Sequence, residues 1–582
     1  MRARMKTAYL SSSAALNAIS KAQVVQLQWT SDLGNLDGQH TLGPDGPWQA
    51  VTIGVGITAI AEIGHGRFST DVWPTGGSET YIVANTSNGL NALDDSPSAT
   101  NTQIYAQAPR EWFVYNTTTT GQSWDAYGYF ESIVLAPLTS NDITVNRSIL
   151  VMNNSIFTEA DGRVLPNKVG ILGLGPESVN SPDNDPSILD QLKAYKNITS
   201  SSFGMHMGSA PHNQSGSLVL GGYEQNRALG KAGTFKIDDS AVVNMFLLDV
   251  LLGTQVGNSP YNQSTIGSIY QGVGNNSYAA DIVKLQGGTP GSVLVEPSPS
   301  VPYIYLPPGT CETASQYLPV IWNESLALYL WNQSDPKYST IINSPAYMAI
   351  VLADSDARNV TIKVPFQLLN LTLSRPLVDK PRSYFPCKSL TTENTEQPVV
   401  SWPLGRAFLQ AAFYGVNYDT QTVFMAQGPG PNMEQRVVKT IDEKDTSILT
   451  NPIDSFEKSW STYWTVLSEP GPTTLPAHHH QSGISAGAKA GIAVGSILGG
   501  LGIFGAAILL WRRTSNKEQT EDLGPTQDRP VTPVEELEAS RIAVDKSDPL
   551  PHEMMAPNVV HEAPHELPHY ELPANHFLYH LK

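Results

Sequence analysis

Cysteine is nearly absent from this chain of 582 residues, which contains only Cys311 and Cys387. Two cysteines are too few for a disulfide-stapled scaffold or for a zinc site made of cysteine thiolates. One structural bridge is the natural prediction if the compartment is oxidising, and two buried free thiols are the alternative.

Basic residues are also scarce, with 35 Lys and Arg against 53 Asp and Glu, for a net charge of −18. No segment could neutralise a phosphate backbone, which excludes nucleic acid as the main partner. The glycines between Gly170 and Gly175 lack the lysine of a phosphate-binding loop. Histidines recur every four residues from His561 to His569, but Pro564 and Pro568 prevent the helix that would align them as metal ligands. We therefore predict no metal and no cofactor.

Charge is absent from residues 490–511, AGIAVGSILGGLGIFGAAILLW. At about 1.5 Å rise per residue, this run is long enough to cross a hydrocarbon core of about 30 Å. Arg512 and Arg513 follow it directly, whereas Lys489 alone precedes it. The positive-inside rule then predicts a single-pass type I protein of the plasma membrane or a secretory-pathway membrane, with residues 512–582 in the cytosol.

Glycosylation sequons are frequent before this run and absent after it. Such sequons predict a part of the chain that is extracellular or lumenal. The twelve acceptor positions are Asn85, Asn116, Asn146, Asn153, Asn197, Asn213, Asn262, Asn275, Asn323, Asn332, Asn359 and Asn370.

Residues 1–22 have a basic start and a Ser-x-Ala pattern from Ser20 to Ala22, which is typical of a signal peptide. Serines interrupt the apolar part, so an incorrectly assigned start of the chain is the alternative. A small-residue face made by Gly487, Gly491, Gly495 and Gly499 is typical of helices that pair within a membrane. Self-association through it and ordinary glycine usage in a single span both remain open.

Short runs of Val, Ile, Tyr and Thr, separated by Gly, Pro, Asn and Ser, fill the chain from about Trp48 to Ala426. This pattern predicts a large all-β unit. Residues 312–332 and 405–413 are the two candidates for short helices.

The composition changes after Gln427. Residues 429–489 are rich in Pro, Gly and Ser, which predicts a stalk without a core of its own. The acidic tail, 512–582, has few large apolar residues until its end and is predicted to be disordered.

Several segments together resemble the pepsin-like aspartic proteases, and within that family the membrane-anchored, non-catalytic members of filamentous fungi. In order along the chain, the segments are GPDGPWQAVTIGVG at Gly43, GSETYIV at Gly77, VGILGLG at Val169, GSLVLGGYEQNR at Gly216, VPYIYLP at Val301, YFPC ending at Cys387, and PLGRAFLQAAF at Pro403. The resemblance implies two β-rich lobes with a cleft between them, placed at 39–220 and 221–428. It also implies a disulfide in the second lobe, where both cysteines lie.

Each lobe of this family lends one Asp-Thr-Gly or Asp-Ser-Gly loop to the floor of the cleft, and neither tripeptide occurs in this chain. The positions that match the two aspartates hold Pro74 and Ser298. Pepsin-type chemistry needs two carboxylates that share one proton and activate a water molecule. The sequence therefore predicts no catalytic residues at these positions.

Three nearby acids are candidate substitutes for the missing aspartates. Asp71, Glu79 and Glu296 lie two to five residues from the matching positions, and such shifts along a strand move a side chain by about 7 Å or more. An alternative pair of Asp71 with Glu296 is the rival, while Glu79 is interpreted as structural. The segment that follows Trp124 leaves little room for the hairpin that closes over substrate in this family.

Three functions remain open. The first is a non-catalytic ectodomain that binds a peptide, protein or glycan in the interlobe cleft. The second is an active membrane-anchored aspartic endopeptidase. The third is a structural glycoprotein that contacts the cell wall or other glycans. Acid-pH cleavage that pepstatin blocks would favour the second, and retention on wall polysaccharide would favour the third.

Overall fold

The computed structural model describes residues 24–33, 42–55, 68–83, 112–116, 122–135, 143–158, 164–176, 186–238, 243–261, 266–273, 278–390 and 401–468. All of them belong to one compact unit, Met1–Glu469 with His569–Lys582. A second unit, Pro470–Pro568, lies outside the described residues, as do the predicted segments 1–22 and 490–582.

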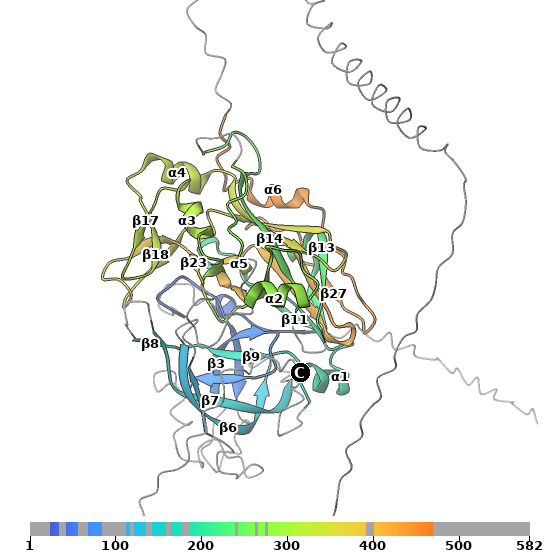
Figure 1. The fold of residues 1–582 in the computed structure, drawn as a ribbon. Helices are drawn as coiled ribbons and strands as arrows, with labels where there is room; N and C mark the ends of the chain where they lie inside the picture. The colour runs from blue at the N-terminus through green and yellow to red at the C-terminus, as the bar shows by residue number, and fades with distance from the viewer. Residues whose placement is uncertain are drawn as a thin grey trace, which may run out of the picture. The chain divides into compact units, whose positions relative to one another are not determined.

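The first lobe is built around an eight-stranded sheet in the order β5-β6-β2-β3-β9-β4-β7-β8. An additional pairing of β6 with β7 closes six of these strands into a ring, drawn in blue to cyan in Figure 1. The strands are β2 (Val51–Val55), β3 (Phe68–Thr75), β4 (Tyr81–Val83), β5 (Trp112–Asn116), β6 (Gln122–Val134), β7 (Thr144–Thr158), β8 (Val164–Pro166) and β9 (Gly170–Gly173).

Strands β5 and β6 form a hairpin in this lobe. Residues Trp112–Asn116 of β5 pair antiparallel with Ser123–Tyr127 of β6. The expectation of little room for a hairpin was wrong, because the first arm comes from residues before Trp124.

The second lobe contains a seven-stranded sheet, β20-β19-β14-β15-β24-β16-β23, and a four-stranded sheet, β17-β18-β22-β21. The strands of the larger sheet are β14 (Phe246–Thr254), β15 (Val293–Pro297), β16 (Ile304–Leu306), β19 (Ala346–Ala353), β20 (Asn359–Pro365), β23 (Cys387–Ser389) and β24 (Ser401–Leu404). Those of the smaller sheet are β17 (Val320–Asn323), β18 (Leu328–Trp331), β21 (Leu371–Leu373) and β22 (Arg382–Phe385).

A six-stranded sheet, β1-β11-β10-β25-β26-β13, is shared by the two lobes. Its central ladder pairs β10 of the first lobe with β25 of the second. The strands are β1 (Val25–Gln26), β10 (Ser202–His206), β11 (Ser217–Leu220), β13 (Leu229–Lys236), β25 (Ala412–Asn417) and β26 (Thr422–Gln427). The mostly β, two-lobed architecture agrees with the prediction.

Helices in the described part of the chain are short. They are α1 (Ile188–Ala194), α2 (Tyr278–Leu285), α3 (Thr310–Ser315), α4 (Pro336–Asn343), α5 (Arg406–Leu409) and α6 (Asp454–Trp460), with the 3-10 turns η1 (Thr30–Leu33), η3 (Ala210–His212), η4 (Gln225–Arg227) and η5 (Tyr418–Thr420). The helix predicted over 312–332 ends at Ser315, and β17 and β18 form a hairpin from the rest. Pro319 and the β-branched and aromatic residues that follow it favour a strand.

Residues 429–468, which we call the C-terminal strap, are folded onto the domain. Its strand β27 (Val438–Thr440) pairs with β12 (Gly222–Glu224), and α6 follows. Later, the Thr465 amide donates to the Asn343 carbonyl of the second lobe at 2.7 Å. From the first lobe, the Thr199 hydroxyl donates to the Ile441 carbonyl of the strap at 3.1 Å. The strap therefore contacts both lobes.

The prediction of a stalk over 429–489 is wrong for the strap, because large apolar side chains anchor it. Phe456 and Trp460 are 2% and 1% exposed. Trp460 also stacks on Trp464, with ring centroids 5.5 Å apart. Burial of these aromatic side chains offsets the conformational entropy lost when the strap is ordered. The Pro- and Gly-rich composition that predicts a stalk belongs to the residues after the strap.

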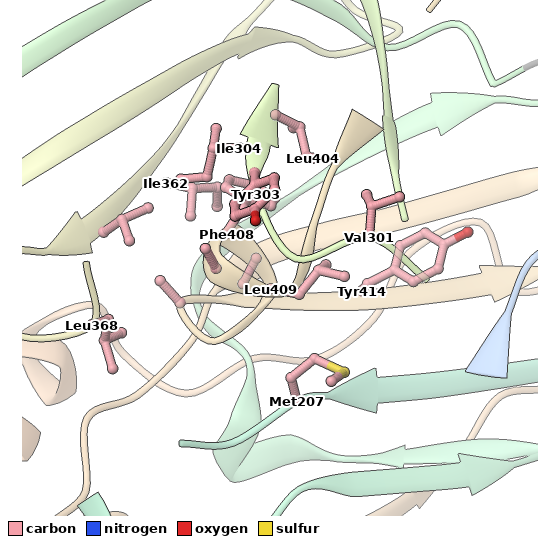
Figure 2. Close-up of a cluster of buried hydrophobic side chains, with 14 of the residues drawn as sticks. Met207, Val301, Tyr303, Ile304, Ile362, Leu368, Leu404, Phe408, Leu409 and Tyr414 are labelled. Atoms are coloured by element: carbon pink, nitrogen blue, oxygen red, sulfur yellow. The ribbon is translucent and has the colours of Figure 1, made fainter. Parts of the chain in front are cut away.

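One apolar core cluster runs through both lobes and positions the segment after β15. Figure 2 shows Tyr303 and Ile304 from that segment packed with Leu404 and Phe408. All four side chains are fully buried. The core thus fixes the loop that the sequence places at the floor of the second lobe.

Candidate functional site

Two strand-and-loop segments occupy equivalent places in the two lobes. In the first, β3 pairs in parallel with β9, and a loop leads to β4. In the second, β15 pairs in parallel with β24, and a loop leads to β16. The same dipeptide lies at the end of each paired strand: Leu172-Gly173 ends β9, and Leu404 ends β24 with Gly405 directly after it. The repeat allows the two loops to be compared residue by residue.

The ladders place a proline at the same register in each lobe. Pro74 lies opposite Leu172, and Pro297 lies opposite Leu404. The loop between β15 and β16 is one residue longer than the loop between β3 and β4. Alignment on the ladders of β16 with β24 and of β4 with β9 instead places Ser298, not Pro297, at the position of Pro74, in agreement with the sequence comparison. Neither proline nor serine carries a carboxylate, so both ways of counting leave these positions without an acid.

Both glycines of the repeat are required by close backbone approach. A Cβ atom on Gly173 would lie 2.5 Å from the Glu79 carbonyl oxygen, and one on Gly405 would lie 2.4 Å from the Tyr303 carbonyl oxygen. No side chain fits at such a distance. Each loop is therefore pressed against the end of its paired strand.

The nearby acids either lie on the opposite face of the strand from the prolines or already accept a hydrogen bond. Asp71 lies three residues before Pro74, on the opposite face of the strand, and its Oδ1 accepts a hydrogen bond from the Thr52 hydroxyl at 2.8 Å. Glu79 accepts a hydrogen bond from the Tyr81 hydroxyl. Asp71 and Glu79 thus each make a hydrogen bond within the first lobe.

Glu296 lies next to Pro297 and therefore points to the other face of β15. Burial raises the pKa of its carboxyl group, and a hydrogen bond from Ser401 opposes that shift. No hydrogen bond between Asp71 and Glu296 occurs in the described part of the chain. A single carboxyl group of this kind can donate or accept one proton, but it cannot reproduce a proton-sharing pair.

The Arg406 guanidinium, at the start of α5, contacts the second loop directly. It is buried, with 4% of the residue exposed. Nη1 donates to the carbonyls of Pro299 at 2.9 Å and Ser300 at 3.1 Å, while Nη2 donates to Asp45 Oδ2 at 3.1 Å. Arg406 thereby ties the second loop to a residue of the first lobe.

Two tryptophans of the first lobe enclose the same guanidinium. Its central carbon lies 4.8 Å from the Trp48 ring centroid and 4.3 Å from that of Trp73, the residue before Pro74. Trp48 also donates from Nε1 to Asp45 Oδ1 at 3.0 Å. Cation–π contacts of this kind are stronger where water is excluded.

The Asp45 backbone is held by the second lobe as well. Its carbonyl accepts a hydrogen bond from the Tyr384 hydroxyl at 2.6 Å. Burial lowers the pKa of Arg406, and Asp45 opposes that shift. An arginine remains charged at any pH of interest and has no acceptor, so it cannot serve as a general base.

The first loop meets two tyrosines, Tyr414 of β25 and Tyr418 of the following turn η5. The Tyr418 hydroxyl donates to the Gly76 carbonyl at 2.9 Å. A Cβ atom on Gly76 would lie 2.8 Å from the Tyr414 hydroxyl oxygen, so the glycine is needed for this approach. Burial raises the pKa of both tyrosines, which keeps them neutral hydroxyl donors.

Arg406 was not singled out from the sequence. A signal was present, because it is the one charged residue in the otherwise apolar and amide run Pro403–Phe413. A charge that a buried segment retains needs a partner. Its partner, Asp45, is more than 350 positions away in sequence, and no short-range pattern links them.

The predicted disulfide is present. Cys311 in α3 and Cys387 in β23 are bonded, with Cα atoms 5.7 Å apart, and both are fully buried. Among the described residues, no three His, Cys, Asp or Glu side chains are grouped closely enough to hold a metal ion.

The predicted glycosylation positions fall in different surroundings. Asn146, Asn213 and Asn359 are exposed. Asn197, Asn323, Asn332 and Asn370 are half-buried, and Asn116 and Asn153 lie on β5 and β7. Asn85, Asn262 and Asn275 lie outside the described residues.

No helix within the described part of the chain is both long and apolar enough to cross a membrane. The run 490–511, with Gly491, Gly495 and Gly499, lies outside that part.

Comparison with known proteins bears on the fold. Residues 75–289 match the family model described as eukaryotic aspartyl protease. The matched range begins one residue after Pro74 and ends before Ser298. No curated protein sequence matches the chain.

Among solved structures, one similar chain is the aspartic proteinase from Irpex lacteus. It is 14% identical in sequence, with a TM-score of 0.42, and the alignment covers 73% of this chain and all of the other.

Proposed function

We propose, from the premise that this chain carries a pepsin-like aspartyl protease domain, that the domain binds a ligand without cleaving it and is displayed by a single membrane span. The observation that carries the proposal is the register of the two loops. Pro74 and Pro297 lie opposite Leu172 and Leu404, so the paired positions offer no carboxylate.

The chemistry of the family explains why this observation is decisive. Two carboxylates at short distance share one proton because they cannot both ionise, and that pair activates a water molecule and protonates the substrate carbonyl. Members of a catalytic unit fail together, so the loss of both acids removes nearly all of the acid and base contribution.

The Arg406 cluster supports the same proposal. It places a permanent cation between the loops, ties Pro299 and Ser300 to Asp45, and gives the second loop a different set of partners. A loop held in this way is stable without a catalytic acid. The ligand that suits an interlobe cleft in this family is a peptide, a protein segment or a glycan.

Display on a membrane is supported by the sequence. The uncharged run 490–511, the arginines at 512 and 513, and the twelve preceding sequons favour an extracellular or lumenal domain with a cytosolic tail. In sealed microsomes, external protease should remove the tail, while the domain stays protected and shifts in mass after endoglycosidase treatment. A protected tail would contradict this topology.

The test of non-catalytic binding uses full-length protein purified in detergent. Denatured protein substrates should remain intact between about pH 3 and 6, the range in which paired carboxylates work. Pepstatin should not raise the melting temperature. Cleavage that pepstatin abolishes would falsify the proposal.

A matched pair of variants extends the test. Pro74→Asp combined with Pro297→Asp, or with Ser298→Asp, should remain inactive, because Arg406 and its partners still hold the second loop. Activity in either double variant would show that the loops retain catalytic geometry.

A further inference from the structure

We propose that an N-linked glycan on Asn359 seats its first sugar in a surface pocket between β13, β20 and the C-terminal strap, and thereby holds the strap in place. This inference rests on the extracellular or lumenal placement in the proposed function. It concerns a site remote in sequence from the two floor loops.

The pocket has a volume of about 230 Å³. Its walls are Leu229, Gly230 and Lys231 of β13, Asn359, Val360, Thr361 and Ile362 of β20, Gln427 of β26, and Ile453 of the strap. Pockets that hold drug-sized ligands typically measure about 300 to 1,000 Å³. This smaller pocket suits a single sugar ring.

The pocket lies beside an irregularity in the ladder of β13 with β26. The register of β13 with β26 shifts between Leu229 and Gly233, and β20 is the edge strand of its own sheet. Gly230 has a φ of +71°, and a Cβ atom there would lie 2.9 Å from Ile453 Cδ1. The glycine therefore allows the strap to reach the rim of the pocket.

The acceptor asparagine lines this pocket. Asn359 and Thr361 belong to the sequon Asn359-Val360-Thr361, and both residues are exposed. The Asn359 amide makes no side-chain hydrogen bond in the described part of the chain. Asn370 differs, because its Nδ2 donates to the Tyr338 hydroxyl at 3.1 Å. Asn359 is thus free for glycosylation.

The chemistry of the walls fits an amphipathic sugar. Ile453 is a large apolar residue that is 58% exposed at the rim, while Lys231 and Thr361 supply polar groups. Gln427 adds little to sugar recognition, because its Nε2 already donates to the carbonyls of Lys363 and Ala411. The apolar face of a sugar ring would pack on Ile453, and the hydroxyl groups of the sugar would face Lys231 and solvent.

The test uses full-length protein from a host that adds N-glycans. Asn359→Gln and Thr361→Ala both remove the sequon, whereas Thr361→Ser keeps it. Asn213→Gln removes a glycan from an exposed turn that does not line the pocket. We expect the first two variants to lower the melting temperature by about 2 °C. Trypsin should also cut them several-fold faster at Arg436 and Lys458 of the strap. The other two variants should match the unmodified protein.

Enzymatic trimming separates the first sugar from the side chain itself. An endoglycosidase that leaves one sugar on each asparagine should preserve the melting temperature. When an amidase removes all N-glycans from both the unmodified protein and Asn359→Gln, their melting temperatures should become equal.

Two failures are distinguishable. If no sequon carries a glycan, the extracellular or lumenal placement is wrong, and the inference falls with it. If Asn213 is glycosylated, the extracellular or lumenal placement stands. The inference about Asn359 is then overturned if Asn359 carries no glycan, or if removal of the Asn359 glycan changes neither the melting temperature nor the rate of strap cleavage.

Discussion

Arg406 and Asp45 form a buried ion pair that joins the two lobes, with Nη2 3.1 Å from Oδ2. The same arginine contacts the Pro299 and Ser300 carbonyls and lies between Trp48 and Trp73. Trp73 immediately precedes Pro74, so one side chain links the floor loops of both lobes. The pair therefore fixes the relative position of two segments that the family uses for chemistry.

Arg406→Met should lower the free energy of unfolding by about 3 to 5 kcal/mol, because it leaves the Asp45 carboxylate buried without its partner. Urea denaturation at neutral pH measures the change. The double variant with Asp45→Asn should lose less than the single variant, since no unpaired charge then remains. Equal losses would show that packing against the tryptophans matters more than the charge.

Stability should fall on acidification because of His206. Burial, helped by the nearby Arg227 guanidinium, lowers the pKa of His206 to about 3, from an ordinary value near 6.5. The neutral ring contributes stability above pH 6.5, and that contribution is lost as the pH falls from 6.5 toward 3, where only the unfolded state binds the proton.

The expected slope from this group is about 1.4 kcal/mol of unfolding free energy per pH unit in that window. His206→Gln, which keeps an amide donor near the Gln410 carbonyl, should remove this part of the slope. Unfolding curves at several pH values measure it. An unchanged slope would mean that carboxylates elsewhere dominate the acid response.

The strap should contribute to the stability of the whole domain. Trp460→Ala removes a side chain that is 1% exposed and should cost about 3 to 5 kcal/mol. Leu449→Ala is the matched control, because Leu449 lies in the same strap but is 66% exposed. Thermal unfolding should separate the two variants, and equal melting temperatures would contradict a packed strap.

The disulfide should stabilise by constraining the unfolded chain. Cys311 and Cys387 are 76 positions apart, and closing a loop of that length contributes about 4 kcal/mol in the chain-entropy account. The double variant Cys311→Ser with Cys387→Ser should unfold at a correspondingly lower urea concentration. Mass spectrometry of unreduced peptides from the unmodified protein should detect the bridge, and two alkylatable thiols would contradict it.

Local patterns predicted much of the fold from the sequence. Alternating strand residues and turn residues predicted a mostly β unit, and the order of the family-like segments predicted the two lobes. The disulfide could also be predicted, because only two cysteines were available. These features depend on residues that lie near each other or have no competing partner.

The misses have a common physical cause, which is that tertiary contacts outweighed local composition. The strap precedes a segment rich in Pro and Gly, yet its own Phe456 and Trp460 are buried in the domain. Arg406 pairs with Asp45, which lies near the opposite end of the domain in sequence. The register of β15 with β24 places Pro297 opposite Leu404, whereas the register of β16 with β24 gives Ser298, and the sequence alone does not reveal this difference between the two loops.

The pairing of β12 with β27 also affects how the chain is made. Tyr223 of β12 pairs with Lys439 of β27, more than 200 positions later, so this ladder cannot form until Lys439 has been synthesised. Because ribosomes deliver the amino-terminal residues first, the edge at Gly222–Glu224 stays open through most of synthesis. Folding of such a topology is slow, since distant contacts must close before they stabilise anything. A chain that terminates before the strap would leave the backbone groups of this strand edge unpaired, where chaperones and proteases could recognise them.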